Sequence, residues 1–247
     1  AIGYNAGGQA EDDTNNTFVG RYAGYAVESS ENTFIGGDAG YGVQDGTTGS
    51  QNTAIGYRTM YNHTTANKNV AVGDQALLAL TTGNSNVSIG MRASENNTVG
   101  SNTVHIGTEA GRYATGSQNT FVGTNAGKGG TTSAPYSSGG NNTAVGYAAL
   151  DAFTTGVENI FMGSSAGSAI TTGNGNVGIG FDVLKVHTTG QYNVAIGWKA
   201  MDDTDAGGNA ANSNNNIAIG ANALGGTWAN AVSEFNIAIG QNSMAGA

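Results

Sequence analysis

The chain has 247 residues, of which 42 are glycine, one is proline and none is cysteine, and its formal net charge is −9. The single proline excludes a collagen helix, the lack of cysteine excludes a disulfide scaffold, and eight Lys and Arg residues provide no basic patch for nucleic acid. No apolar run approaches the roughly 20 residues that a membrane-spanning helix needs, so we expect no membrane insertion.

One five-residue phrase, roughly Asn-(Thr/Val/Ile)-x-(Val/Ile)-Gly, recurs along the chain. Its closing glycines are spaced by a base period of 17 residues, and the longer repeats have 20 or 23 residues. A fixed period of this kind predicts a repeat architecture. Complete phrases begin at Asn16, Asn52, Asn86 and Asn193 and close at Gly20, Gly56, Gly90 and Gly197.

Each phrase has the composition of a short β-strand. Ile or Val nearly always precedes the glycine, and Thr, Val or Ile stands two residues earlier, as in Val87 and Ile89. A period of two places both positions on one face of a strand. We expect this branched face to line the interior. The alternate face carries Ala, Ser, Gly, His or Phe, and we expect it to form a second surface suited to close approach by another subunit.

Further features follow each phrase at fixed offsets. Alanine stands three residues after the glycine, as at Ala93, and predicts a second buried column. A Thr-Thr-Gly turn then follows in several repeats, as at 81–83. We interpret the recurrent Asn as a stacked side-chain ladder and the closing glycines as corners with positive φ.

Together these features predict an all-β fold, a parallel β-solenoid of about 14 coils in a single repeat domain, residues 1–247. Seventeen residues at about 3.3 Å each give one small coil with a perimeter of about 56 Å. Neither end carries a polar cap, so we expect a segment of a longer fibre protein. Closed symmetry would protect the solenoid, and we prefer a homotrimer.

Aromatic residues supply the candidate ligand-binding positions. Tyr136 and Trp228 stand in two of the long repeats, and insertions in a solenoid often form a binding face. Tyr57, Tyr147 and Trp198 directly follow a phrase glycine. Aromatic faces near Asn and Asp suit sugar binding. The alternative is that these rings cover coil edges or pack between subunits.

Metal and cofactor signals are weak. Asp203 and Asp205 resemble half of a calcium loop, but the distal Glu of such a loop is missing. The alternative is a solvated acidic loop, and we expect no other cofactor. His63, His105 and His187 stand in different repeats, and we expect no shared metal constellation. His105 occupies the alternate face and is a candidate for the axis of an oligomer.

The chain gives no sign of catalysis. Residues 163–167 match the G-x-S-x-G nucleophile elbow, but other repeats place other residues in the serine slot. A thin rod also offers few clefts for acid–base chemistry. We therefore predict that the chain is not an enzyme. Ice binding by the Thr-Thr-Gly turns is disfavoured, since adjacent threonines on a strand point to opposite faces.

The phrase, followed by x-x-Ala-(Leu/Gly) and a Thr-Thr-Gly turn, resembles the head repeats of trimeric autotransporter adhesins. It is also similar to repeats of phage tail fibres. The resemblance covers nearly the whole chain and implies a left-handed parallel β-roll of three chains, displayed outside the cell or on a virion and used for attachment. Two departures are the period, which is usually slightly shorter than 17 in adhesin heads, and the absence of an anchor and stalk heptads in this sequence.

The expected function is therefore that of an extracellular or virion-associated fibre or adhesin segment. It would attach to a cell surface by binding a glycan or a surface receptor. The alternatives are a purely structural shaft, an ice-binding solenoid and a tailspike that degrades polysaccharide.

Overall fold

The computed structural model describes residues 1–9, 14–43, 47–202, 213–226 and 234–245. In these residues the regular secondary structure consists of thirteen strands of three residues each, without a helix, and the all-β prediction is confirmed. The chain divides into two compact units, residues 1–119 and 120–247, which are described one at a time. The prediction of a single domain over 1–247 stays a prediction.

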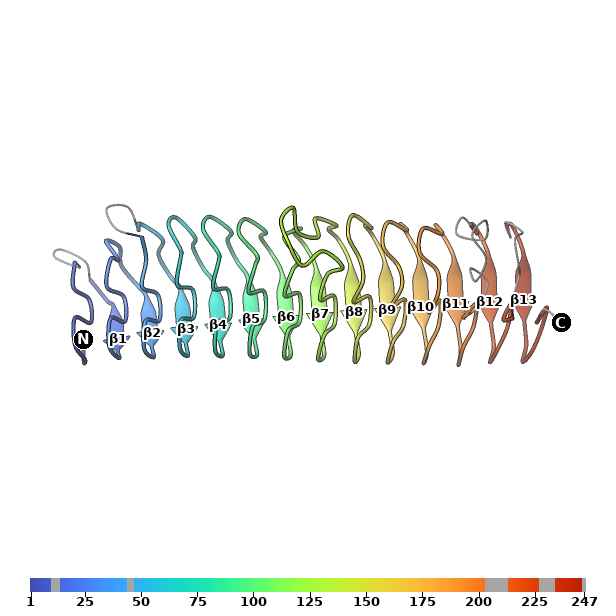
Figure 1. Ribbon diagram of the computed structural model, residues 1–247, viewed down its shortest axis with the longest axis horizontal. Helices are drawn as coiled ribbons and strands as arrows, with labels where there is room; N and C mark the ends of the chain where they lie inside the picture. The colour runs from blue at the N-terminus through green and yellow to red at the C-terminus, as the bar shows by residue number, and fades with distance from the viewer. Residues whose placement is uncertain (10–13, 44–46, 203–212, 227–233, 246–247) are drawn as a thin grey trace. The chain divides into compact units, whose positions relative to one another are not determined.

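In the first unit, each strand pairs in parallel with the next strand in sequence. Figure 1 shows one strand in each coil, from blue at β1 to green at β6. Val87 lies opposite Val70 on one side and Val104 on the other, so equivalent residues of successive repeats stack. The strands are β1 (Thr17–Val19), β2 (Thr33–Ile35), β3 (Thr53–Ile55), β4 (Val70–Val72), β5 (Val87–Ile89) and β6 (Val104–Ile106).

The second unit repeats this pattern. Val194 lies opposite Ile217 across a repeat of 23 residues, so the long repeats return to the register of the short ones. The predicted parallel β-solenoid with a base period of 17 residues is confirmed in both units. The strands are β7 (Thr120–Val122), β8 (Thr143–Val145), β9 (Ile160–Met162), β10 (Val177–Ile179), β11 (Val194–Ile196), β12 (Ile217–Ile219) and β13 (Ile237–Ile239).

The predicted interior face of the strands is wrong. The middle residue of each strand points inward, and Phe34, Ser88 and His105 are fully buried, whereas Ile35 and Ile89 are each 37% exposed. The reason is geometric, because a three-residue strand with its middle side chain inward points its two flanking side chains outward. The small residues therefore form no outer surface for a second subunit, and His105 does not lie at an oligomer axis.

The opposite wall of the coil fills the remaining interior. The alanine three residues after the glycine is fully buried, as at Ala93 and Ala166, and the predicted second column is confirmed. The residue after it also lies inside and varies with the middle residue of the strand. Gly167 faces the ring of Phe161, whereas a Leu or Met stands there when the strand carries Ala or Gly. A large side chain on the strand wall of a coil is thus matched by glycine on the opposite wall, and Ala or Gly on the strand wall by Leu or Met.

The predicted asparagine ladder is confirmed. The backbone N–H and Nδ2 of Asn69 both donate to Oδ1 of Asn52, at 3.0 and 3.1 Å. Nδ2 of Asn69 also donates to the carbonyl of Gly83, at 3.0 Å, so this buried amide is paired on both sides. The N–H of Asn86 donates in turn to Asn69. Both bonds to Oδ1 also run from Asn193 to Asn176, and the backbone N–H of Asn32 donates to Oδ1 of Asn16.

The phrase glycines adopt the positive φ that was predicted for coil corners. Their φ values are 134° at Gly20, 138° at Gly56, 136° at Gly90 and 133° at Gly197. A Cβ added at Gly90 would lie 2.4 Å from the carbonyl oxygen of Gly107 in the next coil. Glycine is needed here for its backbone conformation and for the close approach of the neighbouring coil.

Substitution of Gly90 by Ala is expected to lower the free energy of unfolding by about 3 kcal/mol or more, because the strained φ and the clash with backbone act together. Gly37→Ala is the matched control. A Cβ at Gly37 would meet only the Tyr57 ring, at 3.5 Å, which is an ordinary contact. Urea unfolding of both variants checks this prediction, and equal stabilities would contradict it.

Candidate functional site

The outward side chains of the strands form an apolar face on each unit. In the first unit, Ile35, Ile55, Ile89 and Ile106 are each 36 to 38% exposed, and an Ile or Val stands at this position in every coil. Successive coils lie about 4.8 Å apart, so the side chains form two continuous ranks. These ranks, here called the outward face, are Thr17, Thr33, Thr53, Val70, Val87 and Val104 in one and Val19, Ile35, Ile55, Val72, Ile89 and Ile106 in the other.

The outward face of the second unit is more apolar. Ile160 is 41% exposed, Met162 is 42% exposed and Ile179 is 39% exposed. A contiguous apolar surface of this kind is a candidate interaction site.

Three of the predicted ligand-binding aromatics are exposed. Tyr57 is 46% exposed, Tyr147 59% and Trp198 50%. Arg58 lies over the Tyr57 ring, with 5.3 Å from the guanidinium carbon to the ring centroid, and Nζ of Lys199 lies 5.1 Å from the Trp198 centroid. All three aromatics follow a phrase glycine and so stand just beyond an outward-facing strand residue. Tyr147 and Trp198 belong to repeats that are three periods apart, so the solenoid does not bring them together.

The other residues predicted to bind a ligand or a metal are partly buried or lie outside the described residues. Tyr136 lies in the loop of residues 128–142 and is partly buried. Trp228 and the two candidate calcium ligands, Asp203 and Asp205, lie outside the described residues. In the part of the chain that the structure describes, no group of three or more His, Cys, Asp or Glu side chains is arranged to hold a metal ion.

The three histidines are buried inside the coils. Desolvation lowers the pKa of His63 to about 4, of His105 to about 3 and of His187 to about 4. Nδ1 of His63 bonds to the carbonyl of Met60 at 2.9 Å, and Nδ1 of His105 bonds to Oγ of Ser94 at 2.6 Å. These side chains are neutral core residues, out of reach of a substrate in solution.

The G-x-S-x-G match and the Thr-Thr-Gly turns make the regular hydrogen bonds of the repeat. The serine of the G-x-S-x-G match, Ser165, donates its backbone N–H to the carbonyl of Tyr147 as the equivalent residues of other repeats do. In the Thr-Thr-Gly turn, Oγ1 of Thr81 donates to the carbonyl of Thr98 at 2.8 Å, while Thr82 is exposed. The two threonines thus have different environments, as expected of adjacent residues. That the chain is not an enzyme stays a prediction.

A feature that sequence reasoning missed is a run of stacked tyrosines in the first unit. The Tyr41 and Tyr61 rings are stacked with centroids 4.9 Å apart, Tyr25 stacks on Tyr41 at 5.2 Å, and Tyr22 meets Tyr25 edge-on at 5.3 Å. We call these four residues the tyrosine cluster. Burial, and then the neighbouring tyrosines and Asp38, raise the pKa of Tyr41. The signal in the sequence is a tyrosine five residues after the glycine in three successive repeats.

Two arginines flank the tyrosine cluster and share one carboxylate. Nη2 of Arg21 lies 3.3 Å from Oδ1 of Asp38, and Nε of Arg58 lies 3.8 Å from Oδ2. The Asp38 side chain is only 8% exposed, whereas those of Arg21 and Arg58 are 61% and 48% exposed. The carboxylate thus holds two exposed guanidinium groups of different coils close together.

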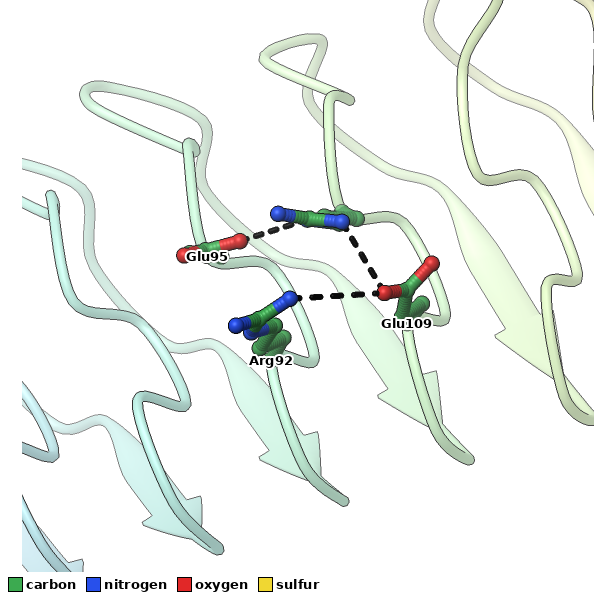
Figure 2. Close-up of polar contacts among 4 residues, drawn as sticks. Arg92, Glu95 and Glu109 are labelled. Carbon is green, nitrogen blue, oxygen red and sulfur yellow. Dashed lines mark hydrogen bonds and ion pairs between the residues drawn. The ribbon is translucent and has the colours of Figure 1, made fainter. Parts of the chain in front are cut away.

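A second group of charged side chains, farther along the same unit, forms ion pairs among its own members. Figure 2 shows the Arg92 side chain turned toward Glu109, with 3.8 Å between Nη1 and Oε1. Arg112 pairs with Glu95 at 2.5 Å and with Glu109 at 2.9 Å. Two cations and two anions balance one another, so this network fastens neighbouring coils and leaves no net charge for a ligand.

Comparison with protein families, curated proteins and solved structures gives no match for the chain. The described residues contain no helix with the length and hydropathy to cross a bilayer.

Proposed function

We propose that this chain is the attachment segment of an extracellular or virion-associated fibre, and that it works as a homotrimer joined through the outward face. The observation that carries the proposal is the outward face itself, in which Ile or Val stands at the same position of every coil of the first unit, and Ile35, Ile55 and Ile89 are each 37 or 38% exposed. Burial of such a surface contributes about 25 cal/mol per Å² of apolar area.

A second copy of the chain is the occupant that fits this face. The ranks repeat once per coil, and another solenoid with the same coil spacing matches them along their whole length. The face has Thr, Val, Ile and one Met but no charged side chain in its ranks, so a copy meets no like charge there, although the chain carries −9 overall. The choice of three copies rests on the resemblance to trimeric adhesin heads.

The mass of the chain in solution tests the assembly. Light scattering should give about three times the 24.7 kDa of one chain. The double variant Ile55→Lys/Ile89→Lys should be monomeric, because two lysines of each chain would be buried unpaired in the interface. Thr65→Lys/Thr82→Lys adds the same charges at exposed turn positions of the same unit and should leave the trimer intact. A monomeric wild-type chain would overturn this assembly.

Attachment is tested separately, by binding of the labelled chain to a panel of cells and to a glycan array. Binding that is lost on substitution of Tyr57, Tyr147 or Trp198 by Ala would support these exposed rings as contacts. The competing function is a structural shaft, favoured by the uninterrupted amide ladder from Asn142 through Asn159 to Asn176. A trimer that binds neither cells nor glycans would be such a shaft.

A further inference from the structure

The surface around Asp38 combines positive charge with exposed aromatic rings in a chain that is otherwise acidic. Arg21 and Arg58 carry two positive charges and Asp38 one negative charge, so the group has a net charge of +1 in a chain of −9. The overall negative charge disfavours non-specific binding of polyanions. The two guanidinium groups that share Asp38 are therefore a candidate anion site, with Asp74, in the coil after that of Arg58, as the nearest further carboxylate by repeat position.

Arg58 retains hydrogen-bonding capacity. Within the described residues its side chain makes one ion pair, at 3.8 Å, and two ring contacts, but no hydrogen bond. A guanidinium group has five N–H donors, and its fork matches a carboxylate in a bidentate manner. Arg21 uses Nη2 toward Asp38, and its side chain is the more exposed of the two.

The aromatic rings fix the guanidinium groups and add a surface for stacking. Arg58 lies 5.3 Å from the Tyr57 centroid and 5.5 Å from that of Tyr61, and Arg21 lies 5.4 Å from that of Tyr22. Arginine held against rings loses less freedom when a ligand binds. Because the faces of Tyr41 are covered by Tyr25 and Tyr61, the cluster presents ring edges and phenol groups, whereas Tyr57 is 46% exposed.

We propose that Arg21, Arg58 and Tyr57, together with the phenol groups of the tyrosine cluster, bind a carboxylate-bearing sugar, such as a uronic acid unit of a surface polysaccharide. The guanidinium groups pair with the sugar carboxylate, the exposed Tyr57 ring contacts the apolar C–H groups of the sugar, and the phenols bond to its hydroxyls. This inference rests on the proposed attachment function and names the ligand class of one site within it.

Titration of the full chain with an oligogalacturonate tests the site, with the same oligosaccharide reduced to its neutral form as the comparison. Calorimetry should show binding of the acidic form and at least about tenfold weaker binding of the neutral form. Arg21→Gln/Arg58→Gln should weaken binding of the acidic form by about tenfold or more. Arg92→Gln removes an arginine from the same repeat position as Arg58 and should leave binding unchanged.

If the double variant fails to fold, Arg58→Lys replaces it, since lysine keeps the charge but lacks the fork, and it should still weaken binding several-fold. Three results would overturn the proposal: no binding of the oligogalacturonate, equal binding of the neutral form, or equal losses in Arg92→Gln and in the double variant. Cell attachment that persists without oligogalacturonate binding would overturn this site alone and leave the proposed attachment function standing.

Discussion

Replacing Phe161 by Ala should lower the free energy of unfolding by about 3–5 kcal/mol, and adding Gly167→Leu should restore most of that loss. Phe161 is fully buried in the strand wall of its coil, and a Cβ at Gly167 on the other wall would lie 2.5 Å from its ring. In the double variant the Leu fills the space that the ring leaves. Leu150 and Leu184 already occupy this position in the two adjacent repeats, with φ of 52° and 49°.

The single variant Gly167→Leu is the control for this swap. It adds a side chain while the ring is still present, and overpacking of this kind should cost more than about 2 kcal/mol. Urea unfolding of the wild type, both single variants and the double variant gives the coupling energy between the two sites. A double variant whose losses are simply the sum of the two single losses would show that the walls are not complementary.

The same complementarity was visible in the sequence. Phe34 and Gly40 share a coil, as do His105 and Gly111, whereas Ala54 is matched by Met60. The pattern is found by comparing, within each repeat, the middle residue of the strand with the residue four positions after the glycine: a large residue at one goes with a small residue at the other. Reading each column separately hides it, because each column alone is simply variable.

The strands were predictable because their signal is repeated thirteen times in the described residues. The face that points inward was not predictable, because an alternating pattern shows that the two faces of a strand differ but does not show which of them is buried. Ile and Val are usually buried, and that preference misled the prediction. The interior of a small coil admits one side chain from each short strand, and in the coil of β3 the amide of Asn52 and Thr59 and Met60 of the opposite wall take the remaining space.

The candidate site was predictable in part. Tyr57, Tyr147 and Trp198 were identified from their place after a phrase glycine and are exposed. The tyrosine cluster was missed because its members lie 16 and 20 residues apart in sequence, from Tyr25 to Tyr41 to Tyr61, and come together only through coil stacking. The shared carboxylate of Asp38 has no sequence signal, since its two arginines occupy different repeat positions.

Acid should unfold this protein through its buried histidines. Their ordinary pKa is 6.5, and in the fold it is lowered to about 4 at His63, about 3 at His105 and about 4 at His187, chiefly by desolvation. Below pH 6.5 the unfolded chain binds protons that the folded chain excludes, so stability falls as the pH decreases from 6.5 toward 4. Above about pH 7.5 the histidines are almost entirely neutral in both states and contribute little pH dependence.

The size of the effect follows from the proton count. Each histidine should lower the free energy of unfolding by up to about 1.4 kcal/mol per pH unit, and by between about 1 and 2 kcal/mol from pH 6.5 to 5, because the unfolded imidazole is only half protonated at pH 6.5. Three histidines together should remove about 5 kcal/mol over the same interval, which is comparable to the whole stability of a marginally stable domain. The lower limit of this interval, pH 5, is above the usual pKa range of carboxylates, so carboxylates contribute little to the change in stability within it.

Neighbouring repeats show which apolar residues can replace the three buried histidines, so that the titrating groups are removed and the interior stays filled. Leu80 occupies the His63 position in the next coil, Ile170 occupies the His187 position in the preceding one, and Phe121 occupies the His105 position opposite a glycine. The triple variant His63→Leu/His105→Phe/His187→Ile should therefore match the wild type at pH 7.5 and be far more stable at pH 5. Urea unfolding midpoints at both values measure this. Midpoints that fall in parallel for the two proteins would show that other groups drive the acid transition.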